Sequence, residues 1–264
     1  MKKLKVFLMG GTKDSINIIK HLKKYYNTYI LTTTTTEYGS KLAIAAGSDE
    51  VIAKALPKDK ILEILTNEKF DAFIDATHPF ASHVTKTAIE CSKKMEIPYI
   101  RFERPISVVE NISDEKLHRV KSFEDAGKLI ETRWYQNNVL HLAGTNTIEF
   151  IIKSINPKNF FPRILNIESS IKKCEELKIP KENIFFMNGV STEEENIDLI
   201  KKTNAKVIIS KESGETGGLP LKINAAIKTN IDFILVERPI VNSLKKENII
   251  SNLEELDSKL NNLF

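Results

Sequence analysis

The residues best suited to chemistry form the run Asp75-Ala76-Thr77-His78-Pro79-Phe80, which follows the apolar pair Phe73-Ile74. A carboxylate, a hydroxyl and an imidazole directly after an apolar run indicate the carboxyl end of a buried strand, where open α/β sheets bind ligands. Pro79 restricts His78 to extended conformations. A neutral imidazole held in this way can bond a ligand carboxyl or transfer a proton. His78 is therefore the candidate catalytic residue, and a purely structural histidine is the alternative.

A second loop of this kind follows the apolar run Val207-Ile208-Ile209-Ser210. Its residues Lys211-Glu212-Ser213-Gly214 combine an ammonium group, a carboxylate, a hydroxyl and a glycine, and Gly217-Gly218 come shortly after. Lysine, small hydroxyls and exposed backbone N–H groups all bind anionic oxygens. We predict an anion-binding loop here, and a solvated flexible loop is the alternative.

Two glycine turns follow the first apolar run of each half of the chain. Gly10-Gly11-Thr12 comes after Val6 to Met9, and Gly144-Thr145-Asn146 holds the corresponding place later. Glycine lets backbone amides approach a phosphate, and a helix N-terminus adds partial positive charge. Neither turn completes Gly-x-Gly-x-x-Gly, so a tight turn that needs glycine is the alternative for each.

Three arginines lie near the ends of predicted strands, where a guanidinium group can clamp a carboxylate with two hydrogen bonds. They are Arg101, Arg104 and Arg238. The last two sit in Glu-Arg-Pro triplets, and for these we favour salt bridges to Glu103 and Glu237. Arg101 is retained as a candidate ligand contact.

The elements that must position these loops alternate between strands and helices. Segments with helical spacing of apolar residues separate short apolar runs at residues 6–9, 29–31, 51–53, 72–74 and 97–102. This alternation predicts an α/β fold whose parallel sheet is covered by helices on both faces.

An internal repeat is visible in the sequence. Asp71 to Pro105 aligns without a gap on Ala205 to Pro239, at a constant offset of 134 residues (239 − 105 = 134). The same offset places Val6 to Gly10 on Leu140 to Gly144. Isoleucines and a final triplet coincide within the longer segment: Ile74 with Ile208, Ile89 with Ile223, Ile97 with Ile231, Ile100 with Ile234, and Glu103-Arg104-Pro105 with Glu237-Arg238-Pro239.

We therefore predict two Rossmann-like parallel-sheet domains related by internal duplication, with chance similarity as the alternative. Their boundary is expected in the polar stretch Glu110 to Lys121, which gives domains 1–110 and 111–264. Because ligands bind outside the carboxyl ends of parallel strands, the expected site is an interdomain cleft lined by Thr12, Glu37, Thr77, Gly144 and Ser213.

Composition narrows the class of protein. The 264-residue chain has a formal net charge of +4, spread along the sequence. This argues against a nucleic-acid partner, which needs clustered basic residues. Two isolated cysteines, Cys91 and Cys174, make neither a disulfide framework nor a metal site. No apolar run reaches the ~20 residues of a membrane helix, and no signal core follows the basic start. We expect a cytoplasmic protein without a metal or a membrane partner.

These segments, in their order along the chain, resemble the precorrin-6A reductase family of cobalamin biosynthesis, including its cobalt-precorrin-6A form. The most specific are Asp75 to Ala81 and Lys211 to Gly214 with Gly217-Gly218. Asn188-Gly189-Val190-Ser191 stands where relatives often show Gly-Pro-Phe-Ser. The other matching pieces are Gly10-Gly11-Thr12 with Asp14-Ser15, Thr36-Glu37-Tyr38-Gly39, Pro98-Tyr99-Ile100-Arg101, and Phe161-Pro162-Arg163-Ile164-Leu165.

The resemblance implies an NADPH-dependent reduction of one carbon–carbon double bond in precorrin-6A or cobalt-precorrin-6A, giving precorrin-6B or its cobalt form. Hydride would pass to a ring carbon and a proton to its neighbour. The cofactor carries the reactive hydride, so the protein mainly orients two large ligands and excludes water. The alternative function is a non-catalytic two-domain protein that binds an anionic metabolite.

The tetrapyrrole, which bears many acetate and propionate groups, is expected at the first half, at Thr12, Asp14, Glu37, Tyr38, Asp75, Thr77, His78 and Arg101. NADPH is expected at the second half, which has two anion-binding turns, at Gly144, Thr145, Gly189, Ser191, Lys211, Glu212, Ser213 and Gly214. The turn Gly10-Gly11-Thr12 makes the first half the alternative location for the cofactor. The metal content of the substrate, NADPH against NADH, and the oligomeric state stay open.

Overall fold

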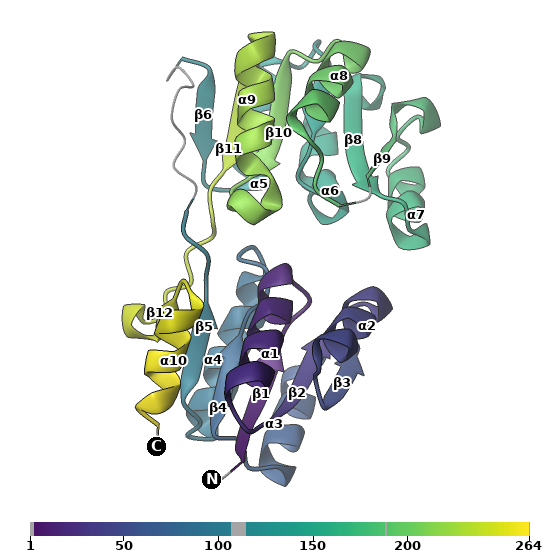
Figure 1. The fold of residues 1–264 in the computed structure, drawn as a ribbon. Coiled ribbons are helices and arrows are strands. Elements are labelled where there is room, and N and C mark those ends of the chain that lie inside the picture. Colours follow the sequence, from purple (N-terminus) through teal and green to yellow (C-terminus); the bar gives the residue numbers. More distant parts are fainter. Residues whose placement is uncertain (1–2, 107–114, 188, 264) are drawn as a thin grey trace. The chain divides into compact units, whose positions relative to one another are not determined.

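The structure, a computed structural model, describes residues 3–106, 115–187 and 189–263 (Figure 1). The chain divides into two compact units. The first comprises Met1–Pro105 together with Ile240–Phe264, and the second comprises Ile106–Pro239. Each unit is built on one six-stranded sheet whose strand pairs are parallel. The predicted α/β fold with two parallel sheets is therefore confirmed.

The sheet of the first unit has the order β12-β5-β4-β1-β2-β3. The chain passes from β1 to β2 on one side and places β4 on the other side, so a switch point lies between β1 and β4. Ligands of open α/β sheets bind at this point, outside the carboxyl ends of the strands. The strands are β1 (Leu4–Met9), β2 (Thr28–Thr34), β3 (Glu50–Ala53), β4 (Ala72–Asp75), β5 (Tyr99–Phe102) and β12 (Ile249–Ile250).

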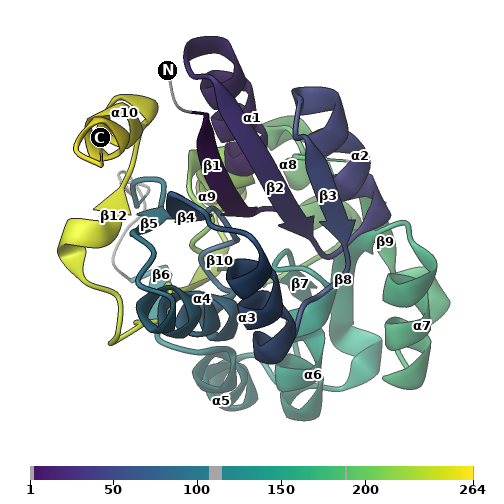
Figure 2. The same cartoon turned by 90° about the horizontal axis from the view of Figure 1, so that it is seen from below.

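Helices cover both faces of this sheet (Figure 2). Val6 and Leu8 of β1 pack against buried residues of α1, α2 and α10, whereas Phe7 and Met9 pack against α3 and α4. Alternating side chains of a strand point to opposite faces, so a strand buried on both faces needs the continuous apolar run seen here. The helices are α1 (Lys13–Tyr25), α2 (Glu37–Ala46), α3 (Lys58–Asn67), α4 (Ser82–Lys94) and α10 (Leu253–Asn261).

The sheet of the second unit has the order β6-β11-β10-β7-β8-β9. Its strands are β6 (Leu117–Val120), β7 (Val139–His141), β8 (Phe160–Leu165), β9 (Phe185–Met187), β10 (Val207–Lys211) and β11 (Asp232–Val236). The order repeats that of the first sheet, with β7 in the place of β1 and β10 in the place of β4. The repeated order agrees with the internal duplication predicted from the 134-residue offset.

One face of the second sheet packs against two helices. Leu140, Ile208 and Phe233 form a buried cluster there with apolar residues of α8 and α9. Helix α5 contacts β6 and β11, and it also packs on α6. The helices of this unit are α5 (Phe123–Arg133), α6 (Ile148–Ile151), α7 (Glu168–Glu176), α8 (Glu193–Thr203) and α9 (Leu219–Thr229).

The edge strand of each sheet comes from the far side of the chain connection. Strand β6 follows β5 in the sequence but pairs with β11, and β12 follows β11 but pairs with β5. The chain therefore leaves the first unit after Pro105 and returns to it after Pro239. Both crossings come directly after the repeated Glu-Arg-Pro triplets.

This exchange corrects the predicted domain limits of 1–110 and 111–264. Residues 240–264 belong to the first unit, because β12 pairs with β5 and the apolar face of α10 buries Leu256 and Leu260 against β1 and α1. The asparagine-capped helix α10 is further fixed by Asp257, which bonds His21 and Tyr26 at 2.7 Å each. The predicted limit between residues 110 and 111 lies outside the described residues.

In the described part of the chain, no helix has the length and apolar character needed to cross a membrane. The interdomain cleft, and its lining by Thr12, Glu37, Thr77, Gly144 and Ser213, stays a prediction.

Candidate active site

Thr12 ties together the ends of two neighbouring strands in the first unit. Its Oγ1 accepts the N–H of Ser15 at 3.2 Å, and its own N–H donates to Oγ of Ser15 at 3.2 Å, which caps α1. The Oγ1 also donates to the carbonyl of Ala76, just beyond β4, at 2.7 Å. Gly11 has a φ of +92°. The sequence Gly-Gly-Thr therefore starts a helix directly at the strand ends.

Asp75, the last residue of β4, is the centre of a buried hydrogen-bond network. Its Oδ1 accepts from the N–H and Oγ1 of Thr77, at 3.0 and 2.7 Å, and from NH1 of Arg101 at 2.8 Å. Its Oδ2 accepts from Thr85 at 2.8 Å and from the hydroxyl of Tyr99 at 2.9 Å. Burial, and next the charge of Asp75, raises the pKa of Tyr99. The network fixes the loop that carries Thr77 and His78.

A cavity of about 210 Å³ opens at the carboxyl ends of β1, β2 and β4. Its lining includes Thr12, Thr34, Lys54, Thr77 and His78. Nδ1 of His78 accepts the N–H of Phe80 at 3.2 Å, and this bond places the proton of a neutral imidazole on Nε2. Hydroxyls, an ammonium group and an imidazole N–H are all donors, so the cavity suits a carboxylate.

In the second unit, the two predicted anion-binding turns follow adjacent strands. Gly144 has a φ of +90° and begins a single 3-10 turn, Thr145–Thr147, after β7. Lys211 ends β10, which pairs with β7. The carboxylate of Glu212 accepts the N–H of Gly214 at 3.1 Å and is paired with Nε of Arg238. Both turns therefore stand at the same edge of the second sheet.

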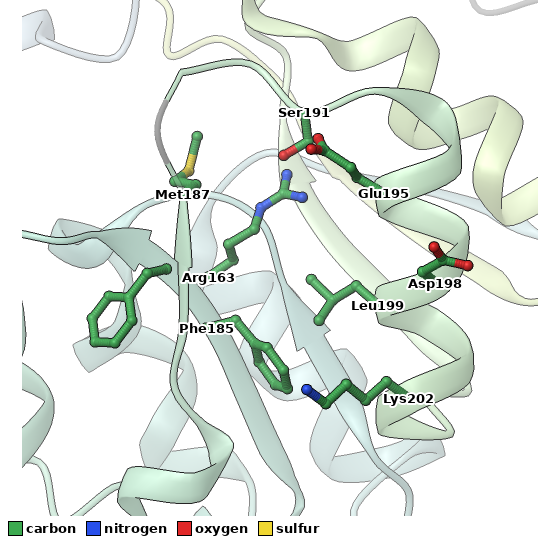
Figure 3. A pocket seen from close by; sticks show the side chains of 9 residues that line it. Arg163, Phe185, Met187, Ser191, Glu195, Asp198, Leu199 and Lys202 are labelled. Atoms are coloured by element: carbon green, nitrogen blue, oxygen red, sulfur yellow. The ribbon is translucent and has the colours of Figure 1, made fainter.

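A second cavity, of about 480 Å³, lies between β8, β9 and the first half of α8 (Figure 3). Arg163 of β8 points toward Ser191 and Glu195 at one end, and Lys202 lies beside Phe185 at the other. Only 5% of Arg163 is exposed, and its NH1 donates to Oδ1 of Asn196 at 2.8 Å. Burial lowers the pKa of Arg163 to about 10, while the charge of Glu195 raises it. The cavity is thus lined by a buried cation.

Three more basic residues surround this edge of the second sheet. Lys222 of α9 donates to the carbonyl of Gly217 at 3.2 Å, and burial lowers its pKa to about 7, with help from the charges of Arg163 and Lys211. Burial also lowers the pKa of Lys211. The pKa of His141 falls to about 3, first by burial and then by the charges of the two lysines. The second unit therefore gathers positive charge where its strands end.

The comparisons with known proteins can be read against this geometry. The family model of precorrin-6x reductase CbiJ/CobK matches residues 5–261. The chain belongs to the precorrin-6x reductase family. It is 37% identical over 256 residues to the cobalt-precorrin-6A reductase of Methanothermobacter thermautotrophicus, covering 97% of this chain and 83% of that one. It is 38% identical over 237 residues to that of Methanocaldococcus jannaschii, covering 89% and 91%.

A solved structure agrees on the fold of the family. The chain resembles a CobK precorrin-6A reductase with a TM-score of 0.74, 17% sequence identity, and 99% and 98% of the two chains covered. Family membership confirms the resemblance found in the sequence and the prediction of a reductase of cobalamin biosynthesis. It favours an enzyme over the non-catalytic alternative.

The structure brings some of the predicted substrate residues together and separates others. Thr12, Thr77 and His78 share the 210 Å³ cavity. Asp75 and Arg101 lie beneath it, 0% and 1% exposed. The three remaining residues are not among those that line the cavity: Asp14 pairs with Arg104, Glu37 is exposed, and Tyr38 is 73% exposed at the start of α2.

The predicted cofactor residues of the second unit occupy three loops. Gly144 and Thr145 follow β7, and the hydroxyl of Thr145 donates to Ser170 at 3.0 Å. Gly189, with a φ of +89°, and Ser191 lie between β9 and α8, and Ser191 lines the Arg163 cavity. The residues of the loop after β10 are half-buried or buried: Lys211, Glu212, Ser213 and Gly214.

Several polar residues of these sites were missed as site residues from the sequence. Arg163 stood only within a matching family segment, although it follows Gly144 by 19 residues (163 − 144 = 19), a spacing that points to the end of the second strand in a Rossmann unit. Lys54 follows a short strand and Lys222 lies inside a helix, where nothing in the local pattern separates them from solvated lysines.

Replacing Lys222 by methionine should stabilise the protein by about 1–4 kcal/mol, because a buried cation is exchanged for a packed apolar chain. The gain should depend on pH. The unfolded chain holds this proton up to about pH 10.5, whereas the folded chain holds it only up to about pH 7. The wild type therefore carries the full penalty below pH 7 and loses it as pH rises through 10.5. Urea unfolding at pH 6, 8 and 10 measures this.

Lys201→Met is the control, since Lys201 is exposed on α8 and should change stability by no more than about 0.5 kcal/mol at every pH. A Lys222 variant that is less stable than the wild type at pH 6 would show that the ammonium group stabilises this edge of the sheet.

Proposed function

We propose that this chain catalyses the NADPH-dependent reduction of one carbon–carbon double bond in cobalt-precorrin-6A, giving the cobalt form of precorrin-6B. The observation that carries the proposal is the 36–38% identity to three archaeal cobalt-precorrin-6A reductases along 89–97% of this chain. Relatives named precorrin-6A reductase, without cobalt, are only 19% and 23% identical. This difference favours the cobalt-containing substrate over the metal-free one.

The first unit is proposed to bind the tetrapyrrole. Thr12, Thr77, His78 and Lys54 present hydrogen-bond donors in one cavity, and the substrate offers carboxylates as acceptors. Asp75 and Arg101 remain in the proposed site as positioning residues, because they are buried and hold Thr77 through hydrogen bonds of 2.7 and 3.1 Å. Asp14, Glu37 and Tyr38 are proposed as outer contacts of the large macrocycle, at the starts of α1 and α2.

The second unit is proposed to bind NADPH, through Gly144, Thr145, Gly189, Ser191 and the loop Lys211–Gly214. Its residues fit such a cofactor. In the described part of the chain, no atom lies within 4 Å of the position that a side chain at Gly144 would take, which leaves room for a phosphate beside the backbone. The basic residues around Lys211 favour an anion at this edge.

Bound NADPH supplies the hydride for a ring carbon. The protein contributes orientation, exclusion of water and a proton for the neighbouring carbon. His78 is the candidate for that proton, because Nδ1 accepts a backbone N–H and Nε2 of the neutral ring carries the hydrogen. Solvent or a substrate carboxyl is the competing proton source.

The function is tested by an anaerobic assay that follows NADPH oxidation at 340 nm with cobalt-precorrin-6A, and in parallel with metal-free precorrin-6A. We expect stoichiometric reduction of the cobalt form and a lower kcat/KM for the metal-free form. Tight binding of the tetrapyrrole without NADPH oxidation would instead support the non-catalytic binding protein. A faster reaction of the metal-free form would reverse the substrate assignment.

His78→Ala should lower kcat/KM about tenfold to a hundredfold and leave the protein folded. Loss of one positioning contact costs about 1–3 kcal/mol when its partner is left unpaired, and 1.36 kcal/mol corresponds to a factor of ten. Steady-state kinetics at varied tetrapyrrole concentration, with circular dichroism as a check on folding, measure this.

His83→Ala is the matched control, because His83 is exposed on α4 and five residues away in the sequence, and it should leave kcat/KM unchanged. If His78→Ala instead lowers kcat by 10²–10⁴-fold at saturating substrate, with unchanged binding of both ligands, His78 is the obligatory acid rather than a positioning residue.

A further inference from the structure

We propose that Arg163 binds the 2′-phosphate of NADPH and thereby makes the second unit select NADPH over NADH. This inference rests on the proposed function, because it concerns the cofactor of the same reaction. It names the residue that recognises the phosphate monoester by which the two dinucleotides differ.

The position of Arg163 in the second unit carries the first step. Strand β7 is the first strand of this unit, Gly144 is the turn after it, and β8 is the second strand, paired with β7. In a Rossmann unit the residue near the end of the second strand, about 20 residues after the glycine turn, meets the ribose of the adenosine half. An acidic residue there bonds the 2′-hydroxyl of NAD, and an arginine accommodates the 2′-phosphate of NADP. Arg163 stands at this place.

The state of the guanidinium group carries the second step. Arg163 is 95% buried by its 5% exposure, yet it lines the 480 Å³ cavity. Its NH1 is held by the neutral side chain of Asn196, which itself donates to the carbonyl of Thr192 at 2.7 Å. Within residues 3–106, 115–187 and 189–263, Nε of Arg163 has no hydrogen-bond partner and the side chain forms no ion pair. A buried cation without a counter-ion is costly, and a phosphate would supply one.

The surroundings of the cavity favour an anion at this end. Helix α8 begins at Thr192, so its first turn adds partial positive charge beside Ser191. Ser191 supplies a hydroxyl to the cavity, and Lys222 adds charge close enough to affect its own pKa through Arg163. Glu195 is the opposing group: its charge acts on Arg163, and its Oε2 accepts the N–H of Thr192 at 2.9 Å. Glu195 should therefore weaken phosphate binding without preventing it.

The test compares nucleotides that differ only in the 2′-phosphate. Dissociation constants of NADPH, NADH, 2′,5′-ADP and 5′-AMP are measured by calorimetry for the wild type, Arg163→Met and Arg163→Lys. The wild type should bind NADPH and 2′,5′-ADP more tightly than their partners. Arg163→Met should weaken NADPH and 2′,5′-ADP about 10- to 100-fold, the range for charged hydrogen bonds, and leave NADH and 5′-AMP within twofold.

Two variants from the same cavity serve as controls. Lys202→Met removes a cation from its other end, beside Phe185, and should leave the ratio of NADPH to NADH affinity unchanged. Glu195→Gln keeps a capping side chain and removes the opposing charge, so it should tighten NADPH but not NADH. If Arg163→Met does not fold, Arg163→Lys decides, because it keeps the charge but loses the fork and should lose part of the preference.

The outcomes separate this inference from the proposed function. A wild type that binds both dinucleotides equally, or an Arg163→Met or Arg163→Lys protein that keeps the full preference, overturns the role of Arg163 and leaves the reductase intact. A variant that raises only the KM of the tetrapyrrole shows that Arg163 binds a substrate carboxylate instead. A wild type that binds neither dinucleotide overturns the cofactor assignment and the inference together.

Discussion

A chain that ends at Pro239 should fail to fold its first unit. The missing segment supplies β12, which pairs with β5, and helix α10. It also removes three buried side chains from the first core, those of Ile250, Leu256 and Leu260. Burial of each is worth about 1.5–3 kcal/mol, or roughly 5–9 kcal/mol together. This is comparable with the whole stability of a domain, about 5–15 kcal/mol.

Hydrogen exchange followed by mass spectrometry measures this effect unit by unit. The truncated chain should lose protection in β1 to β5 and keep it in β7 to β11. Full-length Glu254→Ala is the control, because Glu254 is exposed on the same helix and should change stability by no more than about 0.5 kcal/mol. Protection lost in the second unit alone would show that residues 240–264 stabilise that unit, as the sequence first suggested.

The architecture of each unit was largely predictable from the sequence. Strands such as β1 and β10 are buried on both faces, so their apolar runs stand out. Their order could be transferred between the two halves because the 134-residue offset aligns β4 with β10 and β5 with β11. Local patterns of this kind depend only on which residues are buried, and both sheets share them.

The exchange of edge strands was not predictable in this way. Strand β12 has two residues, Ile249–Ile250, and β6 has the mixed sequence Leu117-His118-Arg119-Val120. An edge strand is covered on fewer sides, so its residues need no continuous apolar pattern. Which sheet it joins depends on partners more than a hundred residues away: Arg101 for Ile249, and Phe233 for Leu117. The sequence around each strand holds no trace of them.

The candidate site was predicted at the level of its loops but not of its depth. Strand ends locate polar residues, so Thr12, Thr77 and His78 could be grouped before their shared cavity was known. Whether a side chain at a strand end faces a ligand or a buried partner depends on residues elsewhere. Asp75 and Arg101 face each other because β4 and β5 pair in register at these two residues.

Asp75→Ala should destabilise the protein by about 3–5 kcal/mol, the range for breaking a buried ion pair by removing one partner. The substitution leaves Arg101, 1% exposed, without its buried carboxylate. It also removes the acceptor of Thr77, Thr85 and Tyr99. Urea unfolding of the whole chain, followed by circular dichroism, measures the loss, and the loop of Thr77 and His78 should lose its hydrogen-exchange protection first.

Two further variants show whether the buried charge is the cause. Tyr99→Phe removes one donor to Asp75 and keeps the ion pair, so it should cost only about 1 kcal/mol. In the double variant Asp75→Leu with Arg101→Met both charges are absent, and much of the stability lost in Asp75→Ala should return, because apolar side chains can replace a buried pair. Its tetrapyrrole binding should stay weak, since Thr77 has then lost both partners that orient it. If Asp75→Ala costs no more than Tyr99→Phe, the network does not hold the site in place.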